Sequence, residues 1–347
     1  MNQCLSIAQA NQSTLNSTAI HPRLIVKDYL RDSSIWNLFA HRRTDIAIAS
    51  CYKSGTTLTQ QIVNLLINGH DDFDHLHDLS PWVEHTGDPL DQKMEQIEKL
   101  PERRFFKTHL PFEALPYHPT WKYICLVRDG RDVGMSLFNH VHALTPEARL
   151  TSPVNLYKPS LDFGEFWDEW IETGKPYWDF FEFINSWLRV RHFPNVLLIH
   201  YNDLINDKPT QLEKLARFLK IKLDSHQKDT ILYKTSMEYM RQNAKKFEHR
   251  DFEKHRFIYK GTNGRWQNLL SARQLKRYDN LLAQKIEPDC TNWVKNGGNL
   301  AKIIYTFPQP SPWTGRKPEK SQISLACPQY SGHTRREVNR WLLQDIY

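Results

Sequence analysis

The chain has 347 residues, of which 40% are hydrophobic and 12% aromatic, so it can bury a core and is not a disordered chain. Its formal net charge of +7 favours an anionic ligand, and a nucleotide, a nucleic acid or a phosphorylated surface would each fit. The five cysteines, at positions 4, 51, 125, 290 and 327, are scattered and form no C-x-x-C pair. Because no apolar leader or long apolar span is present either, we expect a cytoplasmic protein with reduced thiols and no membrane span.

Changes in composition along the chain predict three parts. Residues 1–22 are polar and are expected to form a tail, and residues 23–300 are expected to form a single domain. Residues 301–347 are expected to form a C-terminal extension, with a proline-rich wrap followed by a short amphipathic helix.

Apolar runs in chain order predict a parallel sheet with helices between its strands. Helical spacing of apolar residues predicts helices at 58–68 and 209–221. Four further runs are nearly continuous in apolar residues, as strands covered on both faces are. These runs span 43–51, 103–109, 122–127 and 195–201. The alternation predicts an α/β fold of three layers, with helices on both faces of a central parallel sheet.

The stretch SCYKSGTT, at 50–57, lies between the first strand and the first helix and has the composition of a phosphate-binding loop. A helix N-terminus presents unpaired N–H groups and a partial positive charge to an anion. Gly55 permits close approach of the backbone, and Lys53 adds a point charge. In the common loop G-x-x-x-x-G-K-[ST] the lysine follows the glycines, whereas Lys53 precedes Gly55. An ordinary capped helix beside a solvated lysine remains the alternative at this point.

Three later stretches carry polar residues expected at the same end of the sheet. RFFKTHLP places Lys107 and His109 at a strand end, where α/β proteins carry their chemistry. YICLVRDGRDVGMS runs from a strand into a helix, with Arg128 at the strand end and Ser136 eight residues later. FIYKGTNGRW combines Lys260 with two glycines, which suggests another anion-binding loop.

In this order and spacing, the four stretches resemble the sulfotransferases that use 3′-phosphoadenosine-5′-phosphosulfate (PAPS). The family motif Y-P-K-S-G-T-T-W corresponds to residues 51–58, and its K-T-H corresponds to 107–109. Its R-(x)7-S corresponds to 128–136, and its late R-K-G-x-x-G-x-W-K corresponds to 259–267. The resemblance covers roughly residues 40–285. It implies a fold similar to the P-loop NTPases and transfer of a sulfuryl group from PAPS to a small-molecule acceptor.

The resemblance also implies a donor site. The 5′-phosphate would be held by Lys53, Ser54, Gly55, Thr56 and Thr57, and the 3′-phosphate by Arg128, Ser136, Lys260 and Gly261. Tyr201 and Thr235 match positions that line the adenosine pocket. Leu58 and Met237 stand where the family has aromatic residues, and Tyr259 stands where it has an arginine, for which Arg256 and Arg265 are the candidate replacements.

Three residues match the catalytic positions of the family. His109 corresponds to the base that takes the proton from the acceptor's hydroxyl or amine. Lys53 and Lys107 would stabilise charge on the departing phosphate oxygen, in a reaction that depends on in-line positioning. This chemistry releases 3′,5′-adenosine bisphosphate (PAP), and neither a required metal nor a metal site is expected.

The segment 71–102 carries ten acidic residues against two lysines, and by resemblance it contributes to the acceptor pocket. An acidic wall would favour a cationic or polar acceptor. Glu84 is the carboxylate expected to contact such an acceptor, with His85 and His140 as further candidates. The simpler interpretation is an exposed helix face with pairs such as Glu95 and Lys99.

Other interpretations of the sequence remain open. A nucleotide kinase or NTPase with an atypical loop is disfavoured by the order of the lysine and by the lack of a clear acidic strand end for Mg²⁺. A non-catalytic PAPS or PAP sensor is disfavoured because the catalytic positions are filled, and nucleic-acid binding because no basic stripe is interleaved with aromatic residues.

The stretch HDDFDHLHD, at 70–78, favours a polar loop over a metal site. The family's dimer motif K-x-x-x-T-V-x-x-x-E is replaced by QNLLSARQLK at 267–276, so a monomer or a different dimer is expected.

Overall fold

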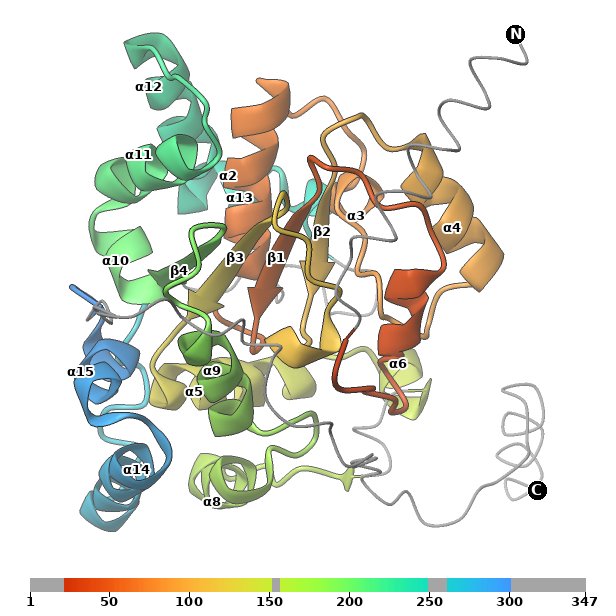
Figure 1. Cartoon of the computed structure of the whole chain (residues 1–347). Coiled ribbons are helices and arrows are strands. Elements are labelled where there is room, and N and C mark those ends of the chain that lie inside the picture. Colours follow the sequence, from red (N-terminus) through yellow and green to blue (C-terminus); the bar gives the residue numbers. More distant parts are fainter. Residues whose placement is uncertain (1–21, 152–156, 249–260, 301–347) are drawn as a thin grey trace, which may run out of the picture.

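The computed structural model describes residues 22–151, 157–248 and 261–300. The predicted C-terminal extension and all but the last residue of the predicted tail therefore lie outside the described residues. At the centre is a four-stranded parallel sheet with the strand order β2-β1-β3-β4 (Figure 1). The strands are β1 (Ile46–Ser50), β2 (Phe105–Thr108), β3 (Lys122–Val127) and β4 (Val196–His200). All four lie within the predicted apolar runs, which confirms those predictions.

Helices follow each strand, and both predicted helices are confirmed as α2 and α11. The α-helices are α2 (Thr56–Asn68), α3 (Leu76–Leu79), α4 (Leu90–Lys99), α5 (Gly130–His142), α6 (Pro146–Thr151), α8 (Phe163–Thr173), α9 (Phe180–Arg189), α10 (Tyr201–Asn206), α11 (Lys208–Phe218), α12 (Ser225–Lys234), α13 (Met237–Gln242), α14 (Ala272–Lys285) and α15 (Pro288–Asn296). Short 3₁₀ helices are η1 (Ser33–Asn37), η2 (Phe112–Ala114) and η3 (Ala244–Lys246). Across the described ranges, no helix is both long enough and apolar enough to span a bilayer.

Local sequence explains where several of these helices begin and end. Asp224 and Gln227 form a capping box at the start of α12, and Ser271 and Gln274 form another at the start of α14. α2 ends at Gly69, whose φ of 75° is readily adopted by glycine and whose N–H bonds the carbonyl of Leu65.

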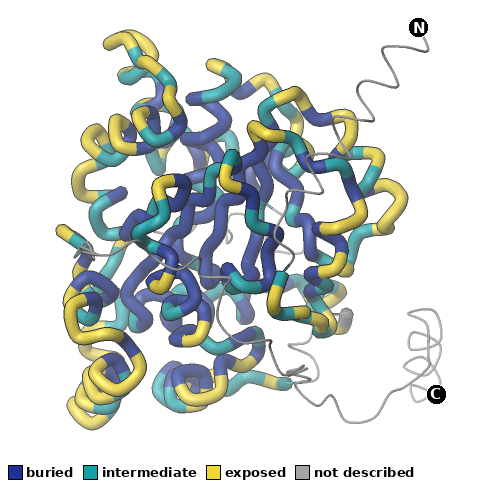
Figure 2. Tube along the Cα trace, viewed as in Figure 1, coloured by how far each residue is buried: buried dark blue, intermediate teal, exposed yellow. Residues whose placement is uncertain are grey.

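The sheet is the middle of three layers because alternate strand residues point to opposite faces. In β1, Ile46 and Ile48 pack with α2, α11 and α12, whereas Ala47 and Ala49 pack with α5, α8 and α9. Every residue of β1 is buried, and the burial along the tube in Figure 2 is deepest at the strands. The three-layer α/β fold with a parallel sheet is therefore confirmed.

Candidate active site

Several of the predicted site residues lie at the carboxyl end of the sheet. All four strands are parallel, so their carboxyl ends meet at this edge, which is where open α/β sheets bind ligands. His109 follows β2, Arg128 follows β3 and Tyr201 follows β4. The loop of residues 51–55 follows β1 and leads directly into α2. The fold thus gathers residues from four separate stretches of sequence.

The loop between β1 and α2 has a special backbone. Tyr52, Lys53 and Gly55 have φ values of 134°, 49° and 99°. A Cβ atom on Gly55 would lie 2.6 Å from Cδ2 of Tyr201, closer than side-chain atoms tolerate. Glycine is therefore required at this position by both the backbone angle and the contact, and the loop lies directly against Tyr201.

The same loop is held by side chains from elsewhere in the chain. Trp178 Nε1 donates to the carbonyl of Cys51 at 2.7 Å, and Arg128 NH1 donates to the carbonyl of Lys53 at 2.9 Å. These bonds fix the loop carbonyls, so the N–H groups at the start of α2 keep one orientation toward an anion.

Of the three hydroxyl residues in the loop and the first turn of α2, two form hydrogen bonds within the protein and one is partly exposed. Ser54 Oγ is buried and donates to the carbonyl of Tyr52 at 2.9 Å. Thr56 Oγ1 lies 2.5 Å from Ser50 Oγ, which joins the first turn of α2 to the end of β1. Thr57 is partly exposed on that turn. The first two hydroxyls thus shape the loop itself.

Arg128 joins this loop to the late glycine loop. Its Nε and NH2 donate to Asn263 Oδ1 at 3.0 and 2.8 Å, and NH2 also donates to the carbonyl of Thr262 at 3.2 Å. Ser136 lies on α5, the helix that begins just after Arg128, and is partly exposed. Of the four residues expected at the 3′-phosphate, Arg128 follows β3 and Ser136 lies on the next element, α5.

The residues expected around adenosine form one wall beside the loop. Tyr201 OH donates to the carbonyl of Gly261 at 3.2 Å. A Cβ atom on Gly261 would lie 1.8 Å from Cε of Met237. Tyr201, Gly261 and Met237 are thus in contact, and the Tyr201 ring also lies against Gly55.

The other residues expected at the donor site lie on separate segments of the chain. Thr235 is buried at the end of α12, where its Oγ1 donates to the carbonyl of Ile231 at 2.6 Å. Leu58 is partly buried and packs against a cluster that includes Met240. Tyr259, Lys260 and Arg256 lie outside the described residues. Repulsion from Arg265 contributes to the lowered pKa of Lys53.

The site concentrates positive charge. Burial, followed by repulsion from Lys107, Arg128 and Arg265, lowers the pKa of Lys53 to about 7. Burial also lowers the pKa of Lys107 to about 8, although Glu84 opposes this shift. Like charges held together out of water destabilise one another, so an anion that neutralises them binds favourably. This arrangement indicates an anionic ligand.

His109 is held as a neutral imidazole. It is 6% exposed, and its Nδ1 lies 2.8 Å from the carbonyl oxygen of Ser50. A carbonyl only accepts, so Nδ1 carries the proton and Nε2 carries the lone pair. Burial, followed by repulsion from Lys107, holds the pKa of His109 well below its ordinary value. A neutral imidazole with an available lone pair is the state that a general base requires.

Glu84 does not lie where the acidic-wall hypothesis placed it. Its side chain is fully buried, and both carboxylate oxygens accept hydrogen bonds from the protein. The donors are Trp36 Nε1, Trp82 Nε1, Thr108 Oγ1 and the N–H of His109. The reason is a bridge between Trp82 and Lys107, which continues the sheet beyond β2 and turns Glu84 inward. Glu84 is therefore corrected from an acceptor contact to an internal contact of the His109 segment.

The other acceptor candidates lie on either side of the loop. His85 stacks on Trp82 at 4.5 Å and its Nδ1 lies 3.0 Å from Asp88 Oδ2. His140 Nδ1 lies 3.1 Å from Lys53 Nζ, so it contacts a donor-site lysine. His85 therefore shares the contact with Trp82 that His109 also makes, and His140 lies beside the loop of residues 51–55.

Several other acidic residues of the segment have basic or hydroxyl partners. Glu95 and Lys99 form the predicted pair on α4 at 2.5 Å, which confirms that prediction. In the polar loop before α3, Asp71 forms an ion pair with Lys234 and accepts from Tyr239 OH. Within the described ranges, no three His, Cys, Asp or Glu side chains are grouped in a way that suits a metal ion.

Arg31, Trp178 and Asn263 are site residues that the motifs did not reveal. Arg31 contacts the carbonyl of His109 across 78 positions of sequence, and Trp178 contacts Cys51 across 127. Neither has a local signal, because the contact depends on the path of distant segments. Asn263 stands inside the late glycine motif, so its position, although not its contact with Arg128, was visible in the sequence.

Known proteins have related sequences and a related fold. The sulfotransferase domain family matches residues 43–288. A glycolipid sulfotransferase of Mycobacterium bovis is 27% identical over 324 residues, which cover 80% of this chain and 96% of that protein. Sulfotransferase 1B1 of Canis lupus familiaris is 29% identical over 282 residues, which cover 76% of this chain and 90% of the relative.

Solved structures agree with these matches. Mouse sulfotransferase SULT7A1 complexed with PAP has a TM-score of 0.60 at 25% identity and covers 76% of this chain and 91% of its own. A retinol dehydratase in complex with androsterone and inactive cofactor PAP shares the fold, with a TM-score of 0.61 at 23% identity over 80% of this chain and 94% of its own. The chain therefore belongs to the sulfotransferase family, as a PAPS-dependent enzyme of that family.

Proposed function

We propose that this enzyme transfers the sulfuryl group of PAPS to a hydroxyl or amine of a small molecule, with His109 as the base. The observation that carries the proposal is the direct bond from Arg128 NH1 to the carbonyl of Lys53, at 2.9 Å. It ties a cationic group suited to one phosphate to a loop suited to another. Tyr201 lies against both, because its ring is 4.3 Å from the Arg128 guanidinium and also contacts Gly55. A nucleotide with phosphates on both sides of its sugar fits this arrangement.

The residues of the site fit PAPS. Lys53 and the start of α2 would hold the 5′-phosphosulfate, and Arg128 with Ser136 the 3′-phosphate, while Arg265 supplies further positive charge. Tyr201, Met237, Thr235 and Leu58 would surround the adenosine. PAPS supplies the sulfuryl group and leaves as PAP.

The proposed catalytic residues would divide the proton transfer and the charge stabilisation between them. His109 Nε2 would accept the proton of the acceptor as the acceptor oxygen or nitrogen attacks sulfur. Lys53 and Lys107 would neutralise the charge that develops on the departing phosphate oxygen. Lys107 Nζ lies 4.5 Å above the Trp82 ring, on the same side of the site as the base.

The surroundings of His109 favour an acceptor with an apolar body. The Trp82 ring lies perpendicular to the imidazole at 4.9 Å, and the Trp178 ring lies at 5.6 Å. Glu84, which would have attracted a cationic acceptor, is engaged by protein donors. Aromatic faces bind flat or alicyclic carbon skeletons through burial of apolar surface, and the acceptor hydroxyl would point at Nε2.

Binding of PAP should be pH-dependent, because the pKa of free Lys53 is lowered to about 7. The bound phosphate stabilises the ammonium and raises this pKa, so at about pH 8 binding takes up protons. As pH rises above the pKa of Lys53 in the unliganded protein, protonating Lys53 on binding costs free energy. The affinity for PAP should therefore fall. Titration calorimetry at pH 8 in two buffers of different ionisation enthalpy measures the uptake, and binding without proton uptake would contradict the assignment.

A thermal shift experiment tests the donor assignment. PAP is compared with 5′-ADP and 5′-AMP over the same range of concentrations, and a ligand that reaches about 100 times its Kd raises the free energy of unfolding by about 2.7 kcal/mol. We expect PAP to stabilise the protein at far lower concentrations than ADP, and Ser136→Ala to reduce that preference. A preference for ADP would instead favour a kinase or NTPase. Turnover of PAPS with a panel of hydroxylated acceptors then separates an enzyme from a sensor.

A further inference from the structure

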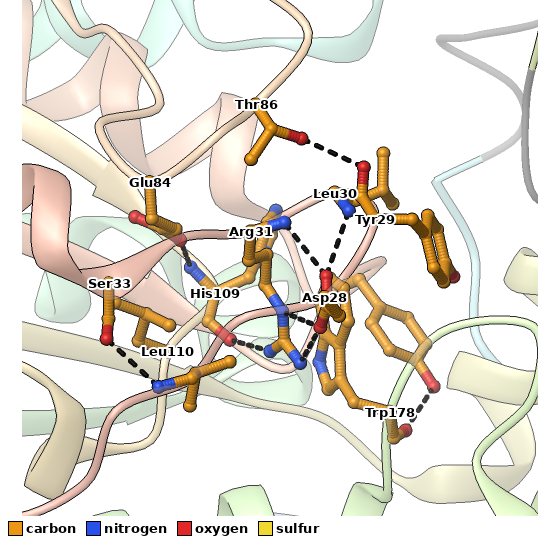
Figure 3. Close-up of polar contacts among 12 residues, drawn as sticks. Asp28, Tyr29, Leu30, Arg31, Ser33, Glu84, Thr86, His109, Leu110 and Trp178 are labelled. Carbon is orange, nitrogen blue, oxygen red and sulfur yellow. Dashed lines mark hydrogen bonds and ion pairs between the residues drawn. The ribbon is translucent and has the colours of Figure 1, made fainter. Parts of the chain in front are cut away.

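We propose that Arg31 and Glu84 are positioning residues that hold the main chain of His109 from both sides, and so aim its imidazole at the acceptor. This inference rests on the proposed function, in which His109 is the base. Figure 3 shows the arrangement: Glu84 meets the N–H of His109, and Arg31 meets its carbonyl.

His109 needs such partners because β2 ends at Thr108. One residue further on, the peptide groups leave the regular ladder of the sheet, and buried N–H and C=O groups must find other partners. Two extended segments provide them. The bridge between Trp82 and Lys107 places Glu84 beside the end of β2, and a bridge between Arg31 and His85 adds the N-terminal segment outside it.

Glu84 fixes the amide side. The N–H of His109 donates to Glu84 Oε1 at 2.7 Å, and Thr108 Oγ1 donates to the same oxygen at 3.0 Å. The indole N–H groups of Trp82 and Trp36 hold the carboxylate at 2.6 and 3.1 Å. Hydrogen bonds to a charged acceptor are shorter and stronger than neutral ones, so this buried carboxylate is a rigid anchor.

Arg31 fixes the carbonyl side. Its NH1 donates to the carbonyl of His109 at 3.1 Å, while Nε and NH2 donate to Asp28 Oδ2 at 2.9 and 2.7 Å. Asp28 also accepts from the N–H groups of Leu30 and Arg31, so the turn and the guanidinium share one carboxylate. The guanidinium stacks 3.8 Å above the ring of Trp178, the residue that also bonds the phosphate loop.

His109 is therefore held at three points, two on its main chain and one on its imidazole. Glu84 holds the amide of His109, Arg31 its carbonyl, and the carbonyl of Ser50 its Nδ1. A displacement of about 1 Å at a reacting group can cost about 10²-fold in rate. Loss of Arg31 or Glu84 should therefore act on turnover through His109, with little effect on the donor phosphates.

A double-mutant cycle tests this inference. We expect Arg31→Met to lower kcat about tenfold or more by misplacing the base, while the Kd for PAP stays near the wild-type value. In a His109→Ala background the same change should have no further effect on kcat, because its effect passes through the imidazole. Arg103→Met is the matched control, since Arg103 also donates to a carbonyl, that of Leu219, away from the site.

Further variants keep the test decisive if Arg31→Met folds poorly. Asp28→Asn removes the charge that orients Arg31 and should give a smaller loss of kcat that also disappears in the His109→Ala background. Glu84→Gln keeps one acceptor oxygen but places an amide against the Trp36 indole N–H, so kcat should fall with PAP binding retained.

The outcomes distinguish a failure of the base assignment from a failure of the positioning role. If His109→Ala itself leaves kcat unchanged, the base assignment in the proposed function fails, and the inference fails with it. If His109→Ala lowers kcat while Arg31→Met does not alter it, or lowers it by the same factor with and without His109, only the positioning role is overturned.

Discussion

His109→Ala is expected to lower kcat by about 10²- to 10⁴-fold, the range that general bases contribute. The affinity for PAP should stay near that of the wild type, because the imidazole is anchored to the end of β1 and makes no contact with the donor loop's N–H groups. The measurements are steady-state turnover with PAPS and an acceptor, and the thermal shift with PAP. The wild-type acidic limb of kcat/KM should lie well below pH 6.5, because the pKa of His109 is lowered and the neutral imidazole is the active form.

His118 provides a matched control for this prediction. It is also a buried histidine, and burial with repulsion from His41 lowers its pKa to about 3, but it contacts His41 in the core. His118→Gln should reduce the free energy of unfolding and leave kcat per PAP-binding site close to wild type. A His109→Ala enzyme that retains wild-type kcat would rule out this residue as the base.

Lys53→Met is expected to lower kcat by about 10²- to 10³-fold and to weaken PAP binding as well. Methionine keeps much of the length of the side chain but removes the only charge that the loop itself supplies. The positive charge matters most when negative charge develops on the leaving phosphate, so the effect on kcat should exceed the effect on ground-state binding. Turnover at saturating PAPS and direct PAP titration separate the two effects.

Lys99→Met is the control for the loss of a lysine, because Lys99 is exposed on α4 and pairs with Glu95. It should change neither kcat nor PAP binding. If Lys53→Met weakened PAP binding but left kcat at saturating PAPS unchanged, Lys53 would be a donor-binding residue without a role in the transfer step.

The proposed adenosine site departs from the pattern that the family resemblance implies. By that resemblance, Leu58 and Met237 stand where aromatic residues are expected, and Met237 packs close to the late glycine loop at Gly261. We infer that the adenine is held by the Tyr201 ring together with flexible aliphatic and thioether groups, which adapt their shape to a ligand. This difference affects how tightly the donor is held more than which donor is bound.

Several features of the protein were determined by local sequence. The four apolar runs became strands, because a continuous apolar run suits a strand buried on both faces. The order strand, loop, helix placed Lys53 and Gly55 at the start of α2, since the glycine fits the left-handed backbone there. Parallel pairing then sent Arg128, His109 and Tyr201 to the same edge of the sheet, as the strand-end positions had predicted.

Only the tertiary structure decided which acidic and basic residues serve the site. Glu84 is one of ten acidic residues in a segment that was expected to face the acceptor. In the structure this segment is bridged to β2, and the buried Glu84 carboxylate accepts the N–H of His109. Arg31 had no motif at all, and its contact with His109 spans 78 positions. Such contacts depend on where distant segments pass one another. Periodicity and motifs report only the local backbone and the neighbouring residues, so the sequence alone indicated His109 as a candidate but not the groups that hold it in place.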